Sequence, residues 1–119
     1  MRVLLVDDEE ELVSTLSERL RFRGVDSDWA CSPKDALSKA EQQVYDIAVL
    51  DVKMPETDGF KLKRRLQESY PKMKFIFMTG HGSDNYYDIG SAETGKEFYL
   101  VKPVNIEILI EKLNDVLQK

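Results

Sequence analysis

The chain has 119 residues, of which 42% are hydrophobic and 33% are charged, a balance typical of one soluble globular domain rather than a disordered or membrane-spanning protein. Its 17 basic and 22 acidic residues give a formal net charge of -5, which argues against direct nucleic-acid binding by this domain. There is one cysteine, Cys31, and one histidine, His81. An intrachain disulfide is therefore excluded, and so is a zinc site built on these two residues.

The chain shows no sign of a targeting or membrane segment. Its first apolar run stops after four residues in a run of acids, and no later run approaches the length needed to cross a bilayer. We therefore expect a cytoplasmic protein with no membrane partner. No repeat, low-complexity run or Pro/Gly-rich linker interrupts the chain, so we predict one domain over residues 1–119.

Five short apolar runs predict strands. They lie at residues 3–6, 25–30, 47–50, 75–78 and 98–101. The second run is the weakest, because it is rich in polar residues. The other runs lack the alternation of half-exposed strands, as expected for parallel strands that are covered on both faces.

Amphipathic segments follow the first two runs and predict helices. The first helix should end at Gly24, because glycine readily takes the left-handed conformation that stops a helix. The second should begin with Ser32 as its N-cap and Pro33 at the first helical position, with Asp35 placed to complete a capping box. Its predicted apolar face consists of Ala36, Leu37, Ala40 and Val44.

Three further helices are expected. The third should start at Asp58 and Gly59, which form a turn and helix start, and should stop before Pro71. The segment 83–95 has two glycines and little apolar material, so its helix should be short or mobile. The last helix should begin near Asn105 and has the most regular apolar face, formed by Ile106, Leu109, Ile110, Leu113, Val116 and Leu117.

This alternation predicts the α/β fold class, with a doubly wound parallel sheet and right-handed crossovers. Ligands of such sheets bind beyond the carboxyl ends of the strands, at the point where the strand order reverses. For a flavodoxin-like (βα)5 domain with the strand order 2-1-3-4-5, that point lies between the first and third strands.

Polar residues stand at these strand ends. Asp7 and Asp8 follow the first strand and Asp51 follows the third, so three carboxylates should converge. Such a cluster has raised pKa values or binds a cation, and oxygen ligands of this kind suit Mg²⁺. Thr79 and Lys102 follow the fourth and fifth strands and match the needs of phosphoryl transfer, with Asp51 as the nucleophile. Alternatively, acids after a strand can simply favour a helix start, and we assign only that role to residues 9–11.

Four motifs, LLVDDE, VLDVKMPETDGF, FMTGHG and FYLVKP, occur in this order along the chain. Together they resemble the receiver domain of two-component response regulators over the whole chain. The resemblance implies that Asp51 accepts a phosphoryl group from a histidine kinase or phosphotransfer protein. It also implies that Mg²⁺ is bound by Asp7, Asp8, Asp51 and the backbone carbonyl of Lys53.

The same resemblance implies roles for other residues. Thr79 and Lys102 would bind the phosphoryl oxygens, and a cis peptide bond before Pro103 would aim the lysine at the site. Tyr99 would turn inward on phosphorylation, drawn by the movement of Thr79, and would change the face made by the fourth helix, the fifth strand and the last helix. Lys53 and His81 would tune the lifetime of the phosphoryl group, and Gly80 would keep the site open.

The resulting functional prediction is a phosphorylation-controlled signalling domain that is not a turnover enzyme. The remodelled face would control an output partner or domain, with transcription suggested by the resemblance of FMTGHG and DVKMP to receivers of nitrogen-regulation activators. A homodimer through that face would use Ile108. Two alternatives are a Mg²⁺-dependent phosphohydrolase of the haloacid-dehalogenase type, although Lys53 stands where its second aspartate is expected, and an unphosphorylated receiver-like binding module.

Overall fold

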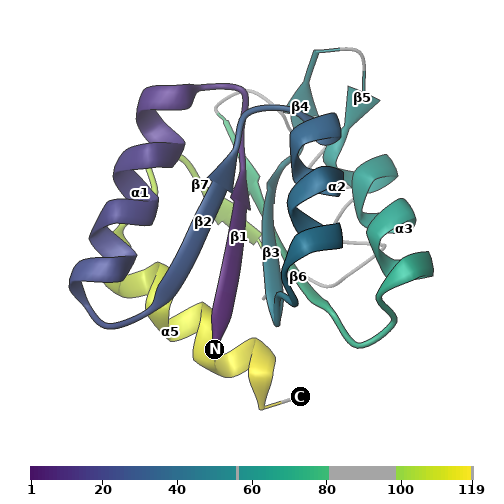
Figure 1. The fold of residues 1–119 in the computed structure, drawn as a ribbon. Helices are drawn as coiled ribbons and strands as arrows, with labels where there is room; N and C mark the ends of the chain where they lie inside the picture. The colour runs from purple at the N-terminus through teal and green to yellow at the C-terminus, as the bar shows by residue number, and fades with distance from the viewer. Residues whose placement is uncertain (56, 81–98, 119) are drawn as a thin grey trace.

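The computed structural model describes residues 1–55, 57–80 and 99–118, and it shows a central sheet with helices on both faces (Figure 1). The five long strands are β1 (Arg2–Val6), β2 (Asp26–Ala30), β3 (Ile47–Asp51), β6 (Lys74–Thr79) and β7 (Tyr99–Val101). All neighbouring pairs are parallel, in the order β2-β1-β3-β6-β7. Since β6 and β7 are the fourth and fifth predicted strands, the predicted order 2-1-3-4-5 is confirmed.

The described helices divide between the two faces of the sheet. They are α1 (Glu10–Phe22), α2 (Pro33–Gln42), α3 (Gly59–Ser69) and α5 (Ile106–Leu117). Figure 1 shows α1 and α5 on one side and α2 and α3 on the other. Alternate residues of β1 and β3 point to opposite sides, so Leu5 and Val49 join the core under α1 and α5 while Leu4 and Leu50 join the core under α2 and α3. Burial on both faces explains why these strands have no polar alternation.

The predicted helix starts are confirmed. Ser32 Oγ accepts a hydrogen bond from the Asp35 amide, 3.1 Å away, and Asp58 Oδ1 accepts one from the Lys61 amide, 2.9 Å away. Asn105 caps α5 by accepting from two backbone amides. Each of these side chains satisfies a donor that the first turn of a helix leaves unpaired. The carboxylate of Asp35 pairs with Lys39 at 3.6 Å.

Gly24 follows the last turn of α1 with a φ of 81°, as predicted for a residue that ends a helix.

The prediction for Val44 is wrong. Helix α2 ends at Gln42, and Gln43 is extended, so the chain leaves the helical path before residue 44. Val44 is 85% exposed, while the next residue, Tyr45, turns inward and is 4% exposed. At the other end of the chain Leu117, in the last turn of α5, is 39% exposed and contributes less to the core than its periodicity suggested.

A small hairpin was not predicted. The strands β4 (Lys53–Met54) and β5 (Thr57–Asp58) pair antiparallel directly after β3. Each strand has only two residues and no apolar alternation, so sequence patterns cannot identify it. Lys53, Met54 and Pro55 of this hairpin line a cavity together with Asp51.

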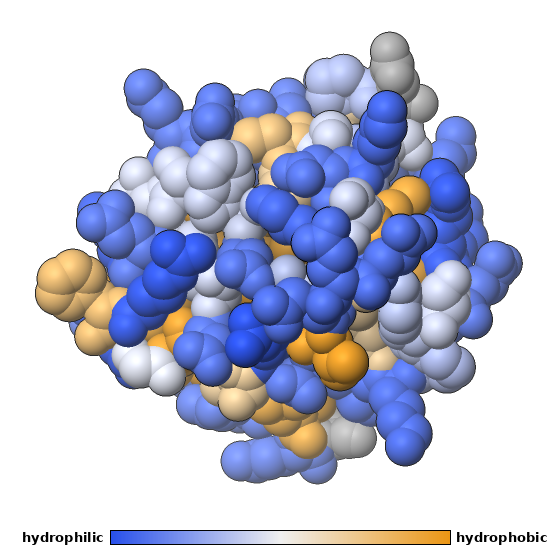
Figure 2. Space-filling view, viewed as in Figure 1, coloured by the Kyte–Doolittle hydropathy of each residue, from blue (hydrophilic) through white to orange (hydrophobic). Residues whose placement is uncertain are grey.

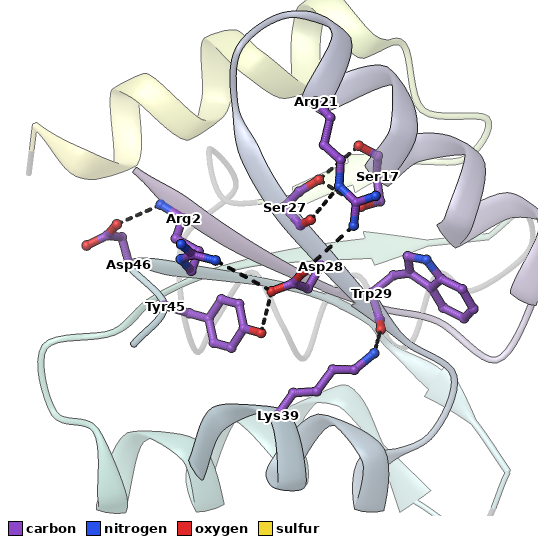
Figure 3. A network of polar contacts seen from close by, with 9 residues as sticks. All are labelled: Arg2, Ser17, Arg21, Ser27, Asp28, Trp29, Lys39, Tyr45 and Asp46. Carbon is purple, nitrogen blue, oxygen red and sulfur yellow. Dashed lines mark hydrogen bonds and ion pairs between the residues drawn. The ribbon is translucent and has the colours of Figure 1, made fainter. Parts of the chain in front are cut away.

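The polar edge strand β2 is held by side-chain contacts (Figure 3). Asp28 accepts a hydrogen bond from the Tyr45 hydroxyl at 2.7 Å and pairs with Arg2 and Arg21 at 3.9 and 3.7 Å. Beside it, the hydroxyl of Ser27 donates to a backbone carbonyl of α1. These contacts explain how a sequence as polar as DSDWA forms a strand, and charged side chains also discourage pairing of this edge with other chains.

Two predictions lie outside the described residues, namely the fourth helix at 83–95 and the placement of His81. Within the described part of the chain, no helix combines the length and the apolar character needed to cross a membrane.

Candidate functional site

The carboxyl ends of the parallel strands bring the predicted residues together. Val6 of β1 pairs with Leu50 of β3, so Asp7 lies beside Asp51 at the edge of the sheet. On the other side of β3, the register of β6 and β7 places Thr79 opposite Val101, and Lys102 comes next. Thus residues that are up to 95 positions apart in the sequence meet because the strands are parallel and adjacent.

Three carboxylates form the centre of the site. Asp7, Asp8 and Asp51 each offer one oxygen, and these oxygens lie within 4.8 Å of one another. Asp7 is fully buried and Asp51 is 4% exposed, whereas Asp8 is exposed. Asp7 Oδ1 accepts a hydrogen bond from the Glu9 amide at 2.9 Å, which fixes the orientation of its carboxylate.

Lys102 reaches into this cluster. Its Nζ lies 2.7 Å from Asp7 Oδ2, 3.2 Å from Asp51 Oδ1 and 3.3 Å from Glu9 Oε1. The peptide bond to Pro103 is cis, as the resemblance implied. The Lys102 amide donates to the Thr79 carbonyl at 2.8 Å, so the lysine backbone is tied to the end of β6.

Burial and mutual repulsion shift the pKa values of the site. Burial raises the pKa of Asp51 to about 7, the charge of Asp7 adds to this shift, and Lys102 offsets only part of it. Burial also raises the pKa of Asp7, although the nearby Lys102 ammonium and the hydrogen bond from the Glu9 amide act in the opposite direction. Burial alone would lower the pKa of Lys102, but its contacts with Asp7 and Asp51 hold that pKa above the usual range. The site therefore has more buried negative charge than one lysine neutralises.

The donor set fits a divalent cation. Asp7 Oδ2 is buried and, within the described residues, meets no hydrogen-bond donor of suitable alignment, although the lysine ammonium is close. Carboxylate oxygens are the hard ligands that Mg²⁺ prefers, and Mg²⁺ usually takes one or two of them together with phosphate oxygens and water. A cation at Asp7, Asp8 and Asp51 would also relieve the repulsion that raises the pKa of Asp51.

A cavity of about 450 Å³ opens onto these carboxylates. Its lining residues are Asp8, Glu9, Asp51, Lys53, Met54, Pro55 and Gly80. Among the described residues, nothing lies within 4 Å of a Cβ atom placed on Gly80, so this part of the structure leaves space beside the site. This space can admit a phosphate-sized group next to Asp51.

Thr79 ends β6 and Tyr99 begins the neighbouring strand β7. Thr79 is 3% exposed, and its Oγ1 lies 3.4 Å from the Gly80 carbonyl. The Tyr99 ring is 6% exposed and stacks on Phe77, with ring centroids 5.4 Å apart. The ring is therefore buried in this structure, and a change of its rotamer on phosphorylation remains a prediction.

One site residue, Glu9, was not identified from the sequence, and the close packing at another, Gly59, was not expected. Glu9 was assigned to a solvated helix start, yet its carboxylate lies beside Lys102 and lines the cavity. Gly59 was assigned to a turn, but a Cβ there would lie 2.5 Å from the Asp51 backbone oxygen, so the start of α3 packs directly against the end of β3. The adjacent Asp58-Gly59 pair hinted at a tight turn; nothing in the sequence pointed to Glu9.

Comparison with known proteins agrees with this geometry. A family model described as "Response regulator receiver domain" matches residues 3–114. The transcriptional regulatory protein TrcR of Mycobacterium tuberculosis is 32% identical over 120 residues that cover 100% of this chain and 46% of that protein. The response regulator ArlR of Staphylococcus aureus is 30% identical over 120 residues that cover 99% of this chain and 53% of that protein. The chain thus spans about half the length of these relatives.

Solved structures show the same fold. A CheY-like response regulator receiver domain protein from Methanospirillum hungatei has a TM-score of 0.85 and 31% identity, covering 98% of this chain and 93% of that one. The chemotaxis protein CheY4 of Vibrio cholerae has a TM-score of 0.82 and 31% identity, covering 98% of each chain. The chain belongs to the response regulator receiver domain family of two-component signal transduction.

Proposed function

We propose that Asp51 is the phosphoryl acceptor of this receiver domain, with a phosphorylated histidine of a kinase or phosphotransfer protein as the donor. One observation carries the proposal. Asp51 is a buried carboxylate at the floor of an open cavity, with two other carboxylates and the Lys102 ammonium around it. The family is a signalling domain rather than a turnover enzyme, which removes the phosphohydrolase alternative.

The transfer forms one bond and breaks one. An Asp51 carboxylate oxygen attacks phosphorus, and the bond from phosphorus to the histidine nitrogen breaks. The electron pair of that bond stays on the imidazole nitrogen, which needs no external oxidant or reductant. The product is an acyl phosphate on Asp51, and its later hydrolysis by water restores the carboxylate.

Asp7, Asp8 and Asp51, together with the backbone carbonyl of Lys53, would hold Mg²⁺. Lys53 lines the cavity from β4, directly after Asp51 and Val52. The metal, when bound, supplies positive charge that stabilises the phosphoryl oxygens and lowers the repulsion between the carboxylates. Asp7 is held in place for this role by the Glu9 amide.

Lys102 and Thr79 would stabilise the new phosphoryl group. Lys102 already contacts Asp51 Oδ1, so a small movement of its ammonium would pair it with an oxygen of the group. Thr79 is a buried hydroxyl at the neighbouring strand end and would donate a hydrogen bond to another oxygen. Its movement would alter the packing around Tyr99 and Phe77, which we propose as the path to the output face.

Family membership supports proposals about the partners and the location of the protein. Response regulator receivers interact with histidine kinases and output domains. We propose a cytoplasmic location, and we propose an output that acts in transcription because the relative TrcR is named a transcriptional regulatory protein. Ile108 of α5 is 48% exposed and could contribute to a homodimer contact on the face that includes β7 and α5. Lys53 and His81 would tune the lifetime of the phosphoryl group.

Intact-mass analysis tests the proposal. The protein is incubated with acetyl phosphate and Mg²⁺, and Asp51→Asn is compared with Asp26→Asn, which changes an exposed carboxylate on β2. We expect one phosphate adduct on the wild type and on Asp26→Asn, none on Asp51→Asn, and none after EDTA treatment. An adduct that survives Asp51→Asn would contradict the assignment. No adduct on any of the proteins would favour the unphosphorylated binding module.

A further inference from the structure

A second cavity lies outside the carboxylate site. It has a volume of about 660 Å³ and lies between α2, α3 and the β4–β5 hairpin. Its lining includes positions 34, 37, 38 and 41 of α2 and positions 61, 62 and 65 of α3. These positions recur every three or four residues, so the groove follows about two turns of α2, which is about 10 Å. We call it the α2/α3 groove.

The floor of the α2/α3 groove is apolar. Leu62 is 2% exposed and belongs to the core, and Leu37 packs against the same core from α2. Pro33 and Pro55 complete the apolar lining at the end near the hairpin. A groove of this depth and composition accepts apolar side chains of a partner.

The rim of the groove is basic although the chain as a whole is acidic. Lys34, Lys61 and Arg65 are exposed and line the groove, and Glu41 is the one acid among the lining residues that the structure describes. Within the described residues, no carboxylate forms an ion pair with any of these three cations. Helix α3, GFKLKRRLQES, carries four cations against one acid, in a chain with a net charge of -5.

Figure 2 shows that hydrophilic residues dominate the drawn face of the molecule and that hydrophobic ones form separate spots on it. The basic rim and apolar floor of the groove itself suit an occupant that is mainly polar with a few apolar anchors. Among the described lining residues, the groove shares only Pro55 with the cavity beside Asp51. It is therefore a separate surface that shares the β4–β5 hairpin with the site.

We propose that the α2/α3 groove binds an acidic amphipathic helix of a partner protein. Two turns of such a helix match the length of the groove, its apolar residues would contact Leu37 and Leu62, and its carboxylates would pair with Lys34, Lys61 and Arg65. A nucleic acid suits the groove less well, because the described lining residues include no aromatic side chain for a base to stack on and the net charge of the chain is negative.

Three synthetic helical peptides distinguish the apolar contacts of the proposed helix from its ion pairs with the basic rim. The first has leucines on one face and glutamates beside them, the second has lysines in place of the glutamates, and the third has serines in place of the leucines. Binding to the full chain is measured by fluorescence anisotropy, and the contact surface is mapped by amide chemical-shift changes. We expect only the first peptide to bind well, with about tenfold weaker binding of the other two, and its shifts to map to α2 and α3.

Charge reversal on the protein provides the matched control. Lys61→Glu with Arg65→Glu should weaken binding of the acidic peptide by about tenfold or more. Arg19→Glu with Lys74→Glu makes the same change of net charge at exposed positions of α1 and β6, and it should leave binding within about twofold. Equal binding of the glutamate and lysine peptides, shifts that map elsewhere, no binding of the acidic peptide, or equal effects of the two double variants would each overturn the proposal.

Discussion

Replacing Asp51 with asparagine should stabilise the metal-free protein, because the native site buries a charge that it cannot fully neutralise. The pKa of Asp51 is raised from 3.8 to about 7, mainly by burial and by the charge of Asp7. A raised pKa means that the folded protein binds a proton more tightly than the unfolded chain, so stability is lost as pH rises from about 4 to about 7. At about 1.4 kcal/mol per pKa unit, this shift of about three units lowers the free energy of unfolding of the wild type by about 4 kcal/mol at pH 8 and by about 2 kcal/mol at pH 5.

Urea unfolding of the wild type and of Asp51→Asn, in EDTA at pH 5 and pH 8, measures this effect. Asp51→Asn should have the higher free energy of unfolding at both pH values, with the larger gap at pH 8. Asp26→Asn, which changes an exposed carboxylate, should have the same free energy of unfolding as the wild type at both pH values. Added Mg²⁺ should narrow the gap, because it would bind the folded wild type more tightly than the variant, which lacks one of the three carboxylates. Equal stability of Asp51→Asn and wild type at pH 8 in EDTA would refute the reasoning.

Three further predictions concern the metal, the turn and the phosphoryl lifetime. Mg²⁺ affinity, measured by calorimetry, should rise by up to about tenfold per pH unit below pH 7 and level off above it, because a proton on Asp51 competes with the metal; a flat profile would contradict the raised pKa. Gly59→Ala should lower the free energy of unfolding by about 1–3 kcal/mol, since its Cβ would meet the Asp51 backbone oxygen, whereas Gln67→Ala on the exposed face of α3 should change little. Lys53→Ala should lose its phosphoryl group faster than wild type in a mass-detected decay, and an unchanged rate would remove Lys53 from the tuning role.

The central part of the site could be predicted because it depends on features that short sequences reveal. Fully apolar runs predict parallel strands buried on both faces, and the order of a doubly wound sheet then determines which strand ends are neighbours. Asp7, Asp51 and Lys102 come at such ends, so their convergence required no knowledge of side-chain conformation. The structure confirms it with contacts of 2.7 and 3.2 Å from the lysine.

The features that escaped prediction depend on long-range packing. Glu9 meets Lys102 only because a long side chain crosses from the end of β7 to the start of α1, and neither residue's spacing reveals that path. The tight approach of Gly59 to Asp51 depends on how α3 leaves the β4–β5 hairpin. Val44 fits the helical period of α2, but the chain becomes extended at Gln43, and the burial of Tyr45 in its place decides the end of the helix.

Chemical trapping of the phosphorylated residue tests the central claim most directly. Borohydride reduces an acyl phosphate to an alcohol, so a phosphorylated aspartate becomes homoserine and can be located by peptide mass mapping. After treatment with acetyl phosphate and Mg²⁺, homoserine is expected at position 51 and at no other aspartate, and it should be absent when EDTA is present. Homoserine at Asp7, at Asp8 or elsewhere, with Asp51 unmodified, would contradict the assignment of Asp51 as the phosphoryl acceptor.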